Sequence, residues 1–233
     1  MAFQVLAGVT LITDPKVLAI PIHENHEAWV NLRTKNTIVL GPSPEVVNNQ
    51  DYTYLRKTVH AKLEKAQTLL PQGLRFCLYE GYRSLKLQKI LFDKQHSNVK
   101  QRHLDWNAED VFLETTKLVS PVINRDKTEN IPPHSTGAAF DVYLLDEHGD
   151  TVDMGIHPKD WMQDKDGMLS LTASVHISPA AIKNRHIMSQ ALLAVGFVNY
   201  PTEYWHWSYG DRYWAFVQGT HQAIYGNAHP PQH

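Results

Sequence analysis

Two short segments about seventy residues apart contain the side chains of this sequence that are best suited to chemistry. His134 begins the segment His-Ser-Thr-Gly-Ala-Ala-Phe-Asp, which ends at Asp141, and Glu203 begins Glu-Tyr-Trp-His, which ends at His206. A catalytic zinc ion takes three protein ligands and leaves its fourth position to water. Two histidines and one aspartate meet that number, and Glu203 is then left as a general base for the water. The pattern therefore indicates a metallohydrolase with one Zn²⁺ bound by His134, Asp141 and His206.

The first segment can be explained in two ways, as part of a metal site or as a purely structural feature. Gly137 and the small alanines after it allow a close approach of backbone or substrate. Asp141 lies between Phe140 and Val142, and a charge in such an apolar run needs a partner, for which a metal ion is suitable. The alternative is an aspartate that bonds backbone groups, together with an exposed loop histidine at position 134.

The second segment raises a question of geometry. In an ideal strand, residues three apart such as Glu203 and His206 face opposite sides. The sequence that follows Glu203 is nevertheless rich in aromatic residues, which are typical of strands. Either Glu203 precedes the strand, or a bulge turns the backbone there. The structural alternative is an edge-strand glutamate in an ion pair, with a histidine stacked among tryptophans.

Arg83 occurs in an unusual turn, Glu-Gly-Tyr-Arg-Ser, after an expected strand. An arginine at this position could stabilise the oxyanion of a tetrahedral intermediate. The alternative is a surface arginine beside a helix N-terminus, where the helix dipole disfavours a cation.

Four segments follow one another in the order Glu80-Gly-Tyr-Arg83, His134-x-x-Gly-x-Ala-x-Asp141, Asp153-Met-Gly155 and Thr202-Glu-Tyr-Trp-His-Trp-Ser-Tyr-Gly-Asp-Arg-Tyr-Trp214. In this order they resemble the zinc D-alanyl-D-alanine dipeptidases, a peptidase family that also includes the murein D,D-carboxypeptidases. The resemblance covers roughly residues 50–217, so it is more specific than one short motif.

The resemblance implies a role for each residue of the site. His134, Asp141 and His206 would be the zinc ligands. Glu203 would be the base, and Arg83 would stabilise the oxyanion. Asp153 would receive the free amino group of a dipeptide. The structural alternative for Asp153 is a turn residue before Gly155. The family often has a serine where this chain has Pro132, and a tyrosine where it has Thr34, and both departures concern the carboxylate end of the substrate.

The composition narrows the class of protein. The chain has 233 residues, of which 42% are apolar and 20% charged, so it can bury a sizeable core. The formal net charge of −2 gives no electrostatic grip on nucleic acid or anionic lipid. The single cysteine, Cys77, lies in an apolar run and allows no intrachain disulfide. There is no basic signal-peptide region and no run of eighteen apolar residues, so we expect a cytoplasmic location without a membrane span.

Helices and antiparallel-looking strands alternate irregularly along the chain, which favours a single α+β domain with a small antiparallel sheet that carries the zinc site. Residues 1–50 are expected to wrap around the core, and residues 218–233 to form a flexible tail. The expected helices are 53–69, 84–96, 106–119 and 179–195, and the expected strands are 74–79, 138–145, 203–208 and 212–217.

These observations together predict a zinc peptidase that hydrolyses D-Ala-D-Ala or a similar D-configured dipeptide. One rival is a murein D,D-carboxypeptidase or endopeptidase, which would require export. Another is a zinc-holding binding module without turnover, against which the presence of both Glu203 and Arg83 argues. The sequence leaves the oligomeric state open.

Overall fold

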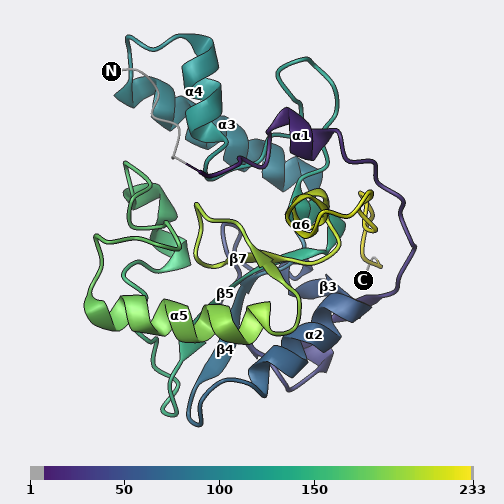
Figure 1. The fold of residues 1–233 in the computed structure, drawn as a ribbon, viewed down its shortest axis with the longest axis vertical. Helices are drawn as coiled ribbons and strands as arrows, with labels where there is room; N and C mark the ends of the chain where they lie inside the picture. Colours follow the sequence, from purple (N-terminus) through teal and green to yellow (C-terminus); the bar gives the residue numbers. More distant parts are fainter. Residues whose placement is uncertain (1–7, 232–233) are drawn as a thin grey trace.

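A five-stranded sheet lies at the centre of the computed structural model, which describes residues 8–231 (Figure 1). The strand order is β2-β4-β5-β7-β6, and every neighbouring pair is antiparallel except β2–β4, which is parallel. A second, two-stranded antiparallel sheet joins β1 to β3. The strands are β1 (Trp29–Asn31), β2 (Val39–Leu40), β3 (Tyr54–Arg56), β4 (Arg75–Glu80), β5 (Ala139–Leu145), β6 (Val198–Asn199) and β7 (His206–Ser208).

The two faces of the central sheet differ because side chains alternate along each strand. On β5, Phe140 and Val142 join the main hydrophobic core, whereas Tyr143 belongs to a smaller cluster on the opposite face with Cys77 of β4. Asp141 precedes Tyr143 by two residues, so both side chains lie on the same face of the sheet. The alternation therefore directs Asp141 away from the main core.

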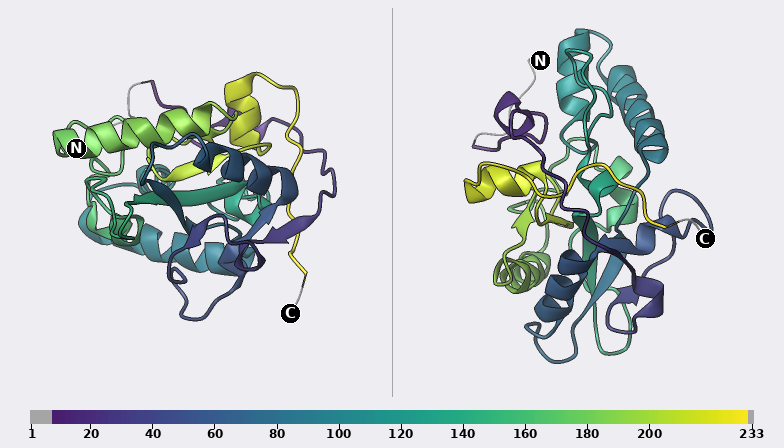
Figure 2. Two further views of the ribbon diagram at one scale, coloured as in Figure 1. Left: turned by 90° about the horizontal axis from the view of Figure 1, so that it is seen from below. Right: turned by 90° about the vertical axis from the view of Figure 1, so that its right-hand side faces the viewer.

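Helices enclose the sheet (Figure 2). The helices α2 and α5 cover the face with the main core, and α3 with α4 lies towards the other side. Ser84 caps α3, Asn107 caps α4 and Ser178 caps α5, each accepting a hydrogen bond from a first-turn amide. The helices are α1 (Pro15–Leu18), α2 (Lys57–Gln67), α3 (Leu85–Arg102), α4 (Ala108–Thr115), α5 (Pro179–Leu193) and α6 (Arg212–Gln218), with 3₁₀ turns η1 (Leu32–Thr34), η2 (Asp51–Thr53), η3 (Pro133–Thr136) and η4 (Pro158–Gln163). Within residues 8–231, none of the helices has the length and apolar character needed to cross a membrane.

The α+β architecture predicted from the sequence is confirmed, but several element boundaries differ. The expected helix 53–69 begins only at Lys57, because Tyr54–Arg56 pairs with β1. The expected strand 203–208 is reduced to His206–Ser208. The expected strand 212–217 was wrong, since this segment is α6, whose N-terminus is capped by the Asp211 carboxylate through the amide of Trp214 at 2.7 Å.

The C-terminal segment also differs from the flexible tail that we expected. Ala223 and Tyr225 are buried, and the amide of His23 donates to the carbonyl of Ala223 at 2.9 Å. Residues near both ends of the described chain therefore pack together. The parts of the expected wrapping segment and tail that fall in residues 1–7 and 232–233 lie outside the described residues.

Candidate metal centre and active site

Strand register brings two of the expected metal ligands together. Asp141 of β5 and His206 of β7 are directly opposite each other in the antiparallel pair, so their side chains lie on the same face of the sheet. Glu80 of β4 is paired with Asp141 on its other side, next to an irregularity between Leu78 and Glu80 that shifts the register. Three polar side chains from three adjacent strands thus share one face.

The third expected ligand, His134, comes from the η3 turn immediately before β5. Its Nδ1 lies 2.7 Å from the carbonyl oxygen of Gly81, a contact that requires a proton on Nδ1 and leaves the lone pair of Nε2 free for a metal. The turn ends at Gly137, whose φ of +71° is left-handed. A Cβ at Gly137 would lie 2.2 Å from the ring of Trp29, so only glycine fits both the conformation and the space.

A buried arginine fixes the same turn from behind. The Nε of Arg56 donates to the carbonyl of Thr136 at 2.7 Å, and its guanidinium also donates to Glu24 at 2.9 Å. The guanidinium lies over the rings of Trp29 and Tyr225, at 4.5 and 5.2 Å from their centroids. The position of His134 therefore depends on packing contributed by segments from both ends of the described chain.

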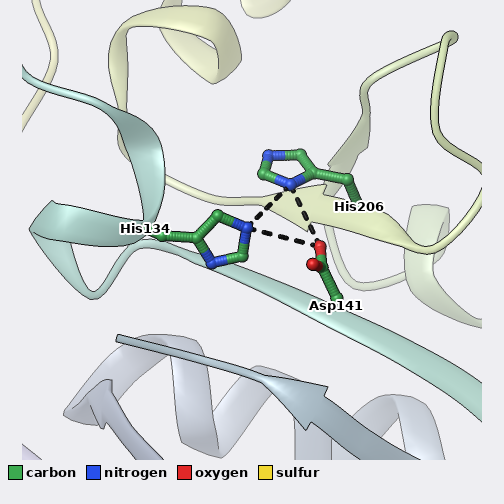
Figure 3. Close-up of side chains that lie close together, drawn as sticks. All are labelled: His134, Asp141 and His206. Atoms are coloured by element: carbon green, nitrogen blue, oxygen red, sulfur yellow. Dashed lines mark hydrogen bonds and ion pairs between the residues drawn. The ribbon is translucent and has the colours of Figure 1, made fainter. Parts of the chain in front are cut away.

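The three side chains point at one another in the arrangement expected of a metal centre (Figure 3). His206 Nδ1 lies 3.1 Å from both His134 Nε2 and Asp141 Oδ1, and His134 Nε2 lies 3.4 Å from Asp141 Oδ1. Ligands placed about 2.0–2.2 Å from a tetrahedral ion stand roughly 3.3–3.6 Å from one another. The donor atoms therefore need to move by only a few tenths of an ångström to fit a zinc ion.

The protonation of the trio suits a cation as well. Burial would raise the pKa of Asp141, but the two neighbouring histidines outweigh it and hold the pKa below the usual range. Burial is the main reason that the pKa of His206 is lowered. A charged carboxylate and a neutral imidazole are the forms that ligate a metal.

Glu203 reaches the same site from the turn that precedes β7, so the first of the two geometries considered for the sequence is the one observed. The amide of His206 donates to the carbonyl of Glu203 at 3.1 Å, which closes this turn. The Glu203 carboxylate lies 4.0 Å from His206 Nδ1 and accepts a hydrogen bond of 3.0 Å from the indole of Trp205. Burial, followed by the nearby charge of Asp141, raises its pKa well above the ordinary value. Glu203 is thus a buried carboxylate with a high affinity for a proton.

Arg83 is held by Glu80, a residue to which the sequence argument assigned no role. The guanidinium donates to both carboxylate oxygens of Glu80 and to the side-chain oxygen of Gln88. Burial would lower the pKa of Arg83, but the charge of Glu80 raises it, so the guanidinium stays protonated. The sequence did offer a signal for Glu80: it directly follows an apolar run and precedes Arg83 by three residues, and a carboxylate at the end of a buried strand needs a partner. The structure shows that Glu80 is buried.

One cavity connects these groups. Its lining includes Arg83, Asp141 and Glu203, and it also includes Glu45, which the sequence argument missed. Nothing in the sequence around Glu45 distinguishes it from a surface loop residue. The remaining lining residues are Tyr79, Glu80, Leu91, Leu118, Val119, Pro158, Trp161 and Trp205.

Asp153 is not brought into this cavity. Its carboxylate is exposed and accepts hydrogen bonds from the amide of Gly155 at 2.8 Å and from the hydroxyl of Ser178 at 2.7 Å. These contacts fasten the turn after β5 to the N-terminus of α5. Pro132 precedes the η3 turn, and Thr34 donates its hydroxyl to the carbonyl of Asn31.

A family model described as D-ala-D-ala dipeptidase, of peptidase family M15, matches residues 37–225. The chain belongs to this family. A D-alanyl-D-alanine dipeptidase from Synechocystis sp. is 25% identical over 231 residues, covering 85% of this chain and 88% of that protein. A D-alanyl-D-alanine dipeptidase from Escherichia coli is 36% identical over 136 residues, covering 58% of this chain and 54% of that protein. Among solved structures, VanYB in complex with D-alanine-D-alanine is similar with a TM-score of 0.42 and 14% identity, covering 77% of this chain and 85% of that one.

Membership of the D-ala-D-ala dipeptidase family makes the chain a peptidase and a hydrolase. The family is zinc-dependent, and the cluster of His134, Asp141 and His206 offers a zinc ion one nitrogen or oxygen atom each. Zinc is therefore the cofactor of this chain, as the sequence predicted.

Proposed function

We propose that this chain is a zinc dipeptidase that cleaves D-Ala-D-Ala or a similar D-configured dipeptide. The observation that carries the proposal is that Glu203 and Arg83 line one cavity with Asp141 of the metal cluster and a second cavity with its two histidines. These are the groups that a metal-assisted hydrolysis of a peptide bond needs: a site for the ion, a carboxylate that transfers the proton and a cation that stabilises the developing oxyanion. The two curated relatives, both named D-alanyl-D-alanine dipeptidase, support the choice of substrate.

In this proposal His134, Asp141 and His206 hold the zinc ion. A zinc ion in such a site supplies a Lewis acid for the scissile carbonyl and lowers the pKa of a coordinated water. Glu203 takes a proton from the attacking water and later returns it to the leaving amine. Its buried position and raised pKa suit both steps, because a carboxylate with higher proton affinity is a better base near neutral pH.

Arg83 is assigned to the oxygen of the scissile carbonyl. Its guanidinium is oriented by two contacts with Glu80 and one with Gln88, so little rearrangement is needed when negative charge develops on the substrate. Glu80 and Gln88 are positioning residues in this scheme.

The test is the release of free alanine by the zinc-loaded protein, with metal analysis of the same sample. We expect D-Ala-D-Ala to be cleaved, L-Ala-L-Ala to be cleaved more slowly, and the N-acetyl form of D-Ala-D-Ala to be a poor substrate. Efficient cleavage of the N-acetyl form would instead support a murein carboxypeptidase. Bound zinc without turnover of any of these peptides would support a non-catalytic binding module.

A further inference from the structure

Asn199, in the short edge strand β6, places its side-chain amide against the turn that carries two groups of the site. Its Nδ2 donates to the carbonyl oxygens of Glu203 at 3.0 Å and of His206 at 2.9 Å. The same nitrogen lies 3.4 Å from the carbonyl oxygen of Tyr204. An amide nitrogen carries two hydrogens, so the two shorter contacts use both of them. One side chain is thus bonded to the backbone of the proposed base and to that of a metal ligand.

The orientation of this amide follows from its neighbours. Three carbonyl oxygens surround one end of the amide, and a carbonyl oxygen can only accept a hydrogen bond. At the other end, the hydroxyl of Thr172 donates to Asn199 Oδ1. The nitrogen must therefore face the carbonyls, because the reverse orientation would place an acceptor against three acceptors. Contacts at both ends hold the side chain in one position.

The turn depends on side-chain donors because it is a long connection. The strands β6 and β7 are antiparallel neighbours, and residues 200–205 connect them, whereas hairpin loops usually have two to five residues. The amide of Glu203 donates to the carbonyl of Tyr200 at 2.9 Å, and the amide of His206 donates to the carbonyl of Glu203 at 3.1 Å. These bonds fold the connection into two successive turns. Carbonyls enclosed by such a loop still need donors, and the Asn199 amide provides two.

These two hydrogen bonds act on the spacing of the functional groups. The Glu203 carboxylate lies 4.0 Å from His206 Nδ1, the atom that faces the other two metal ligands. Both side chains project from the residues whose carbonyls Asn199 binds. A base must be within hydrogen-bond reach of the proton that it removes. A displacement of about 1 Å costs on the order of 10²-fold in rate, so the shape of this turn matters for turnover.

Asn199 itself does not line the substrate space. Among the described residues, those that line the two cavities around Glu203 and Arg83 do not include it. An effect of Asn199 on catalysis must therefore pass through the turn that it holds. Such an effect changes kcat, whereas the loss of a substrate contact would raise KM.

We propose that Asn199 is a positioning residue that sets the spacing between the base Glu203 and the zinc ligand His206. This inference rests on the proposed function, which assigns the proton transfer to Glu203. Because one amide holds the backbone of both residues, its loss should disturb metal binding and turnover together.

Asn199→Asp tests the proposal with almost no change in shape. The variant keeps an acceptor for the hydroxyl of Thr172, but it loses both donors and places a carboxylate against the carbonyls. We expect kcat for D-Ala-D-Ala to fall about 10- to 100-fold, while KM changes less than about threefold. Zinc affinity, measured by competition with a chelator, should fall about tenfold.

Asn184→Asp is the matched control. The Asn184 amide is also half-buried and also donates to a backbone carbonyl, that of Asp153 at 2.8 Å, but it does not contact the turn that carries Glu203. We expect kcat and zinc affinity of this variant to match wild type. An equal loss of both in the two variants would mean that any half-buried amide has this effect, and the role of Asn199 would be refuted.

Cobalt substitution gives a measurement that does not depend on turnover. Co²⁺ can replace Zn²⁺ at sites with nitrogen and oxygen ligands, and its visible absorption bands report the coordination geometry. Asn199→Asp should shift or weaken these bands, and Asn184→Asp should leave them as in wild type. A loss of stability alone, with bands, zinc affinity and kcat unchanged, would refute the positioning role. A rise in KM at constant kcat would also refute it.

Thr172→Val provides a second variant in case Asn199→Asp does not fold. It removes the hydroxyl that orients the amide and leaves both donors in place, so kcat should fall by only about two- to fivefold, with a smaller change of the cobalt bands. If wild type cleaves no dipeptide but the bands change in these two variants, the proposed function fails and the role of Asn199 stands. Unchanged bands and zinc affinity in both variants would overturn that role, whatever the wild type cleaves.

Discussion

The floor of the active-site cavity is built on strands, whereas its outer wall is built on loops. On the floor, Glu80, Asp141 and His206 are neighbours across β4, β5 and β7, and their relative positions follow from register. On the wall, Glu45 and Trp161 come from two loops that meet through one long hydrogen bond. The floor holds the groups that any metal-assisted hydrolysis of a peptide bond needs. The wall is made of loop residues, and loops can change without disturbing the sheet.

The largest effect should come from the proton-transferring carboxylate, which the turn before β7 places beside the floor. Glu203→Gln keeps the size of the side chain and its acceptor for Trp205, but an amide cannot take a proton from water. We expect kcat to fall by about 10²–10⁴, with zinc content unchanged. Steady-state kinetics and metal analysis on one sample check this. A kcat close to wild type with zinc bound would show that another group is the base.

The next effect tests whether Arg83 and Glu80 act as a pair. Arg83→Met leaves the buried Glu80 carboxylate without its cation, and such a loss costs about 3–5 kcal/mol of unfolding free energy. Adding Glu80→Gln removes the stranded charge, so the double variant should regain most of that stability. Turnover should stay low in both variants because the oxyanion partner is absent.

Urea unfolding and kcat measured on Arg83→Met, Glu80→Gln and the double variant form a complete cycle. If the double variant recovered activity along with stability, Arg83 would be a structural residue rather than a catalytic one.

The third prediction compares two glycines with similar backbone conformations. Gly137, beneath His134, has a φ of +71°, and Gly167, in an outer loop, has a φ of +66°. Alanine at either position bears the strain of the left-handed region, about 1–2 kcal/mol. Only at Gly137 does the new Cβ also collide with Trp29, whereas nothing lies within 4 Å at Gly167. We expect Gly137→Ala to be less stable than Gly167→Ala by about 1–3 kcal/mol.

Zinc affinity distinguishes the two glycines further. Gly137→Ala should weaken zinc binding, because the turn that orients His134 must shift, and Gly167→Ala should leave it unchanged. Both quantities can be measured by thermal unfolding and by competition with a chelator. Equal effects of the two alanines would mean that the metal turn tolerates displacement.

The smallest effect concerns acid stability at the loop that carries Asp153. The Ser178 hydroxyl and then the Gly155 amide donate to this carboxylate and hold its pKa below the usual value. Because the pKa of Asp153 is lower in the folded than in the unfolded state, its ionised carboxylate stabilises the fold at pH values above the unfolded-state pKa. This stabilisation is lost as the pH falls through the folded-state pKa. Because the group is exposed and screened by solvent, we expect less than about 1 kcal/mol.

Asp153→Asn removes this titration while keeping a side-chain acceptor. Urea unfolding of the metal-free protein should show wild type more stable than Asp153→Asn at pH 6, with the difference shrinking towards pH 3. A difference that grew as the pH fell would reverse the assigned direction of the pKa shift.

The same division between floor and wall explains what the sequence could predict. The apolar run at 138–145, interrupted only by Asp141, predicts β5. The paired motifs predict the three metal ligands that the structure brings together. Register is invisible in one sequence, so the alignment of Glu80 with Asp141 and His206 could not be foreseen. The aromatic run at 212–217 resembles a strand, but the Asp211 cap and packing against α1 make it a helix.

The limits of the sequence are clearest on the loops. Asp153 lies in a motif shared with a known family, yet its carboxylate contacts α5 rather than the cavity. Glu45 lies in no motif, and only the tertiary course of its loop brings it beside Tyr79 and Trp161. A loop residue acquires its neighbours from the fold as a whole, so local pattern says little about them.

The clamp around Arg56, formed by Glu24, Trp29 and Tyr225, has a consequence for how the enzyme is made. During synthesis the chain emerges from its N-terminus, so Trp29 and Arg56 leave the ribosome long before His206 and Tyr225. The turn that carries His134 is therefore synthesised before Tyr225, whose ring packs over the guanidinium of Arg56 that supports this turn. Metal acquisition should then be a late event in biogenesis, coupled to completion of the polypeptide. A nascent chain arrested before residue 206 would lack a ligand, and one arrested before residue 225 would have all three ligands but an unfinished clamp.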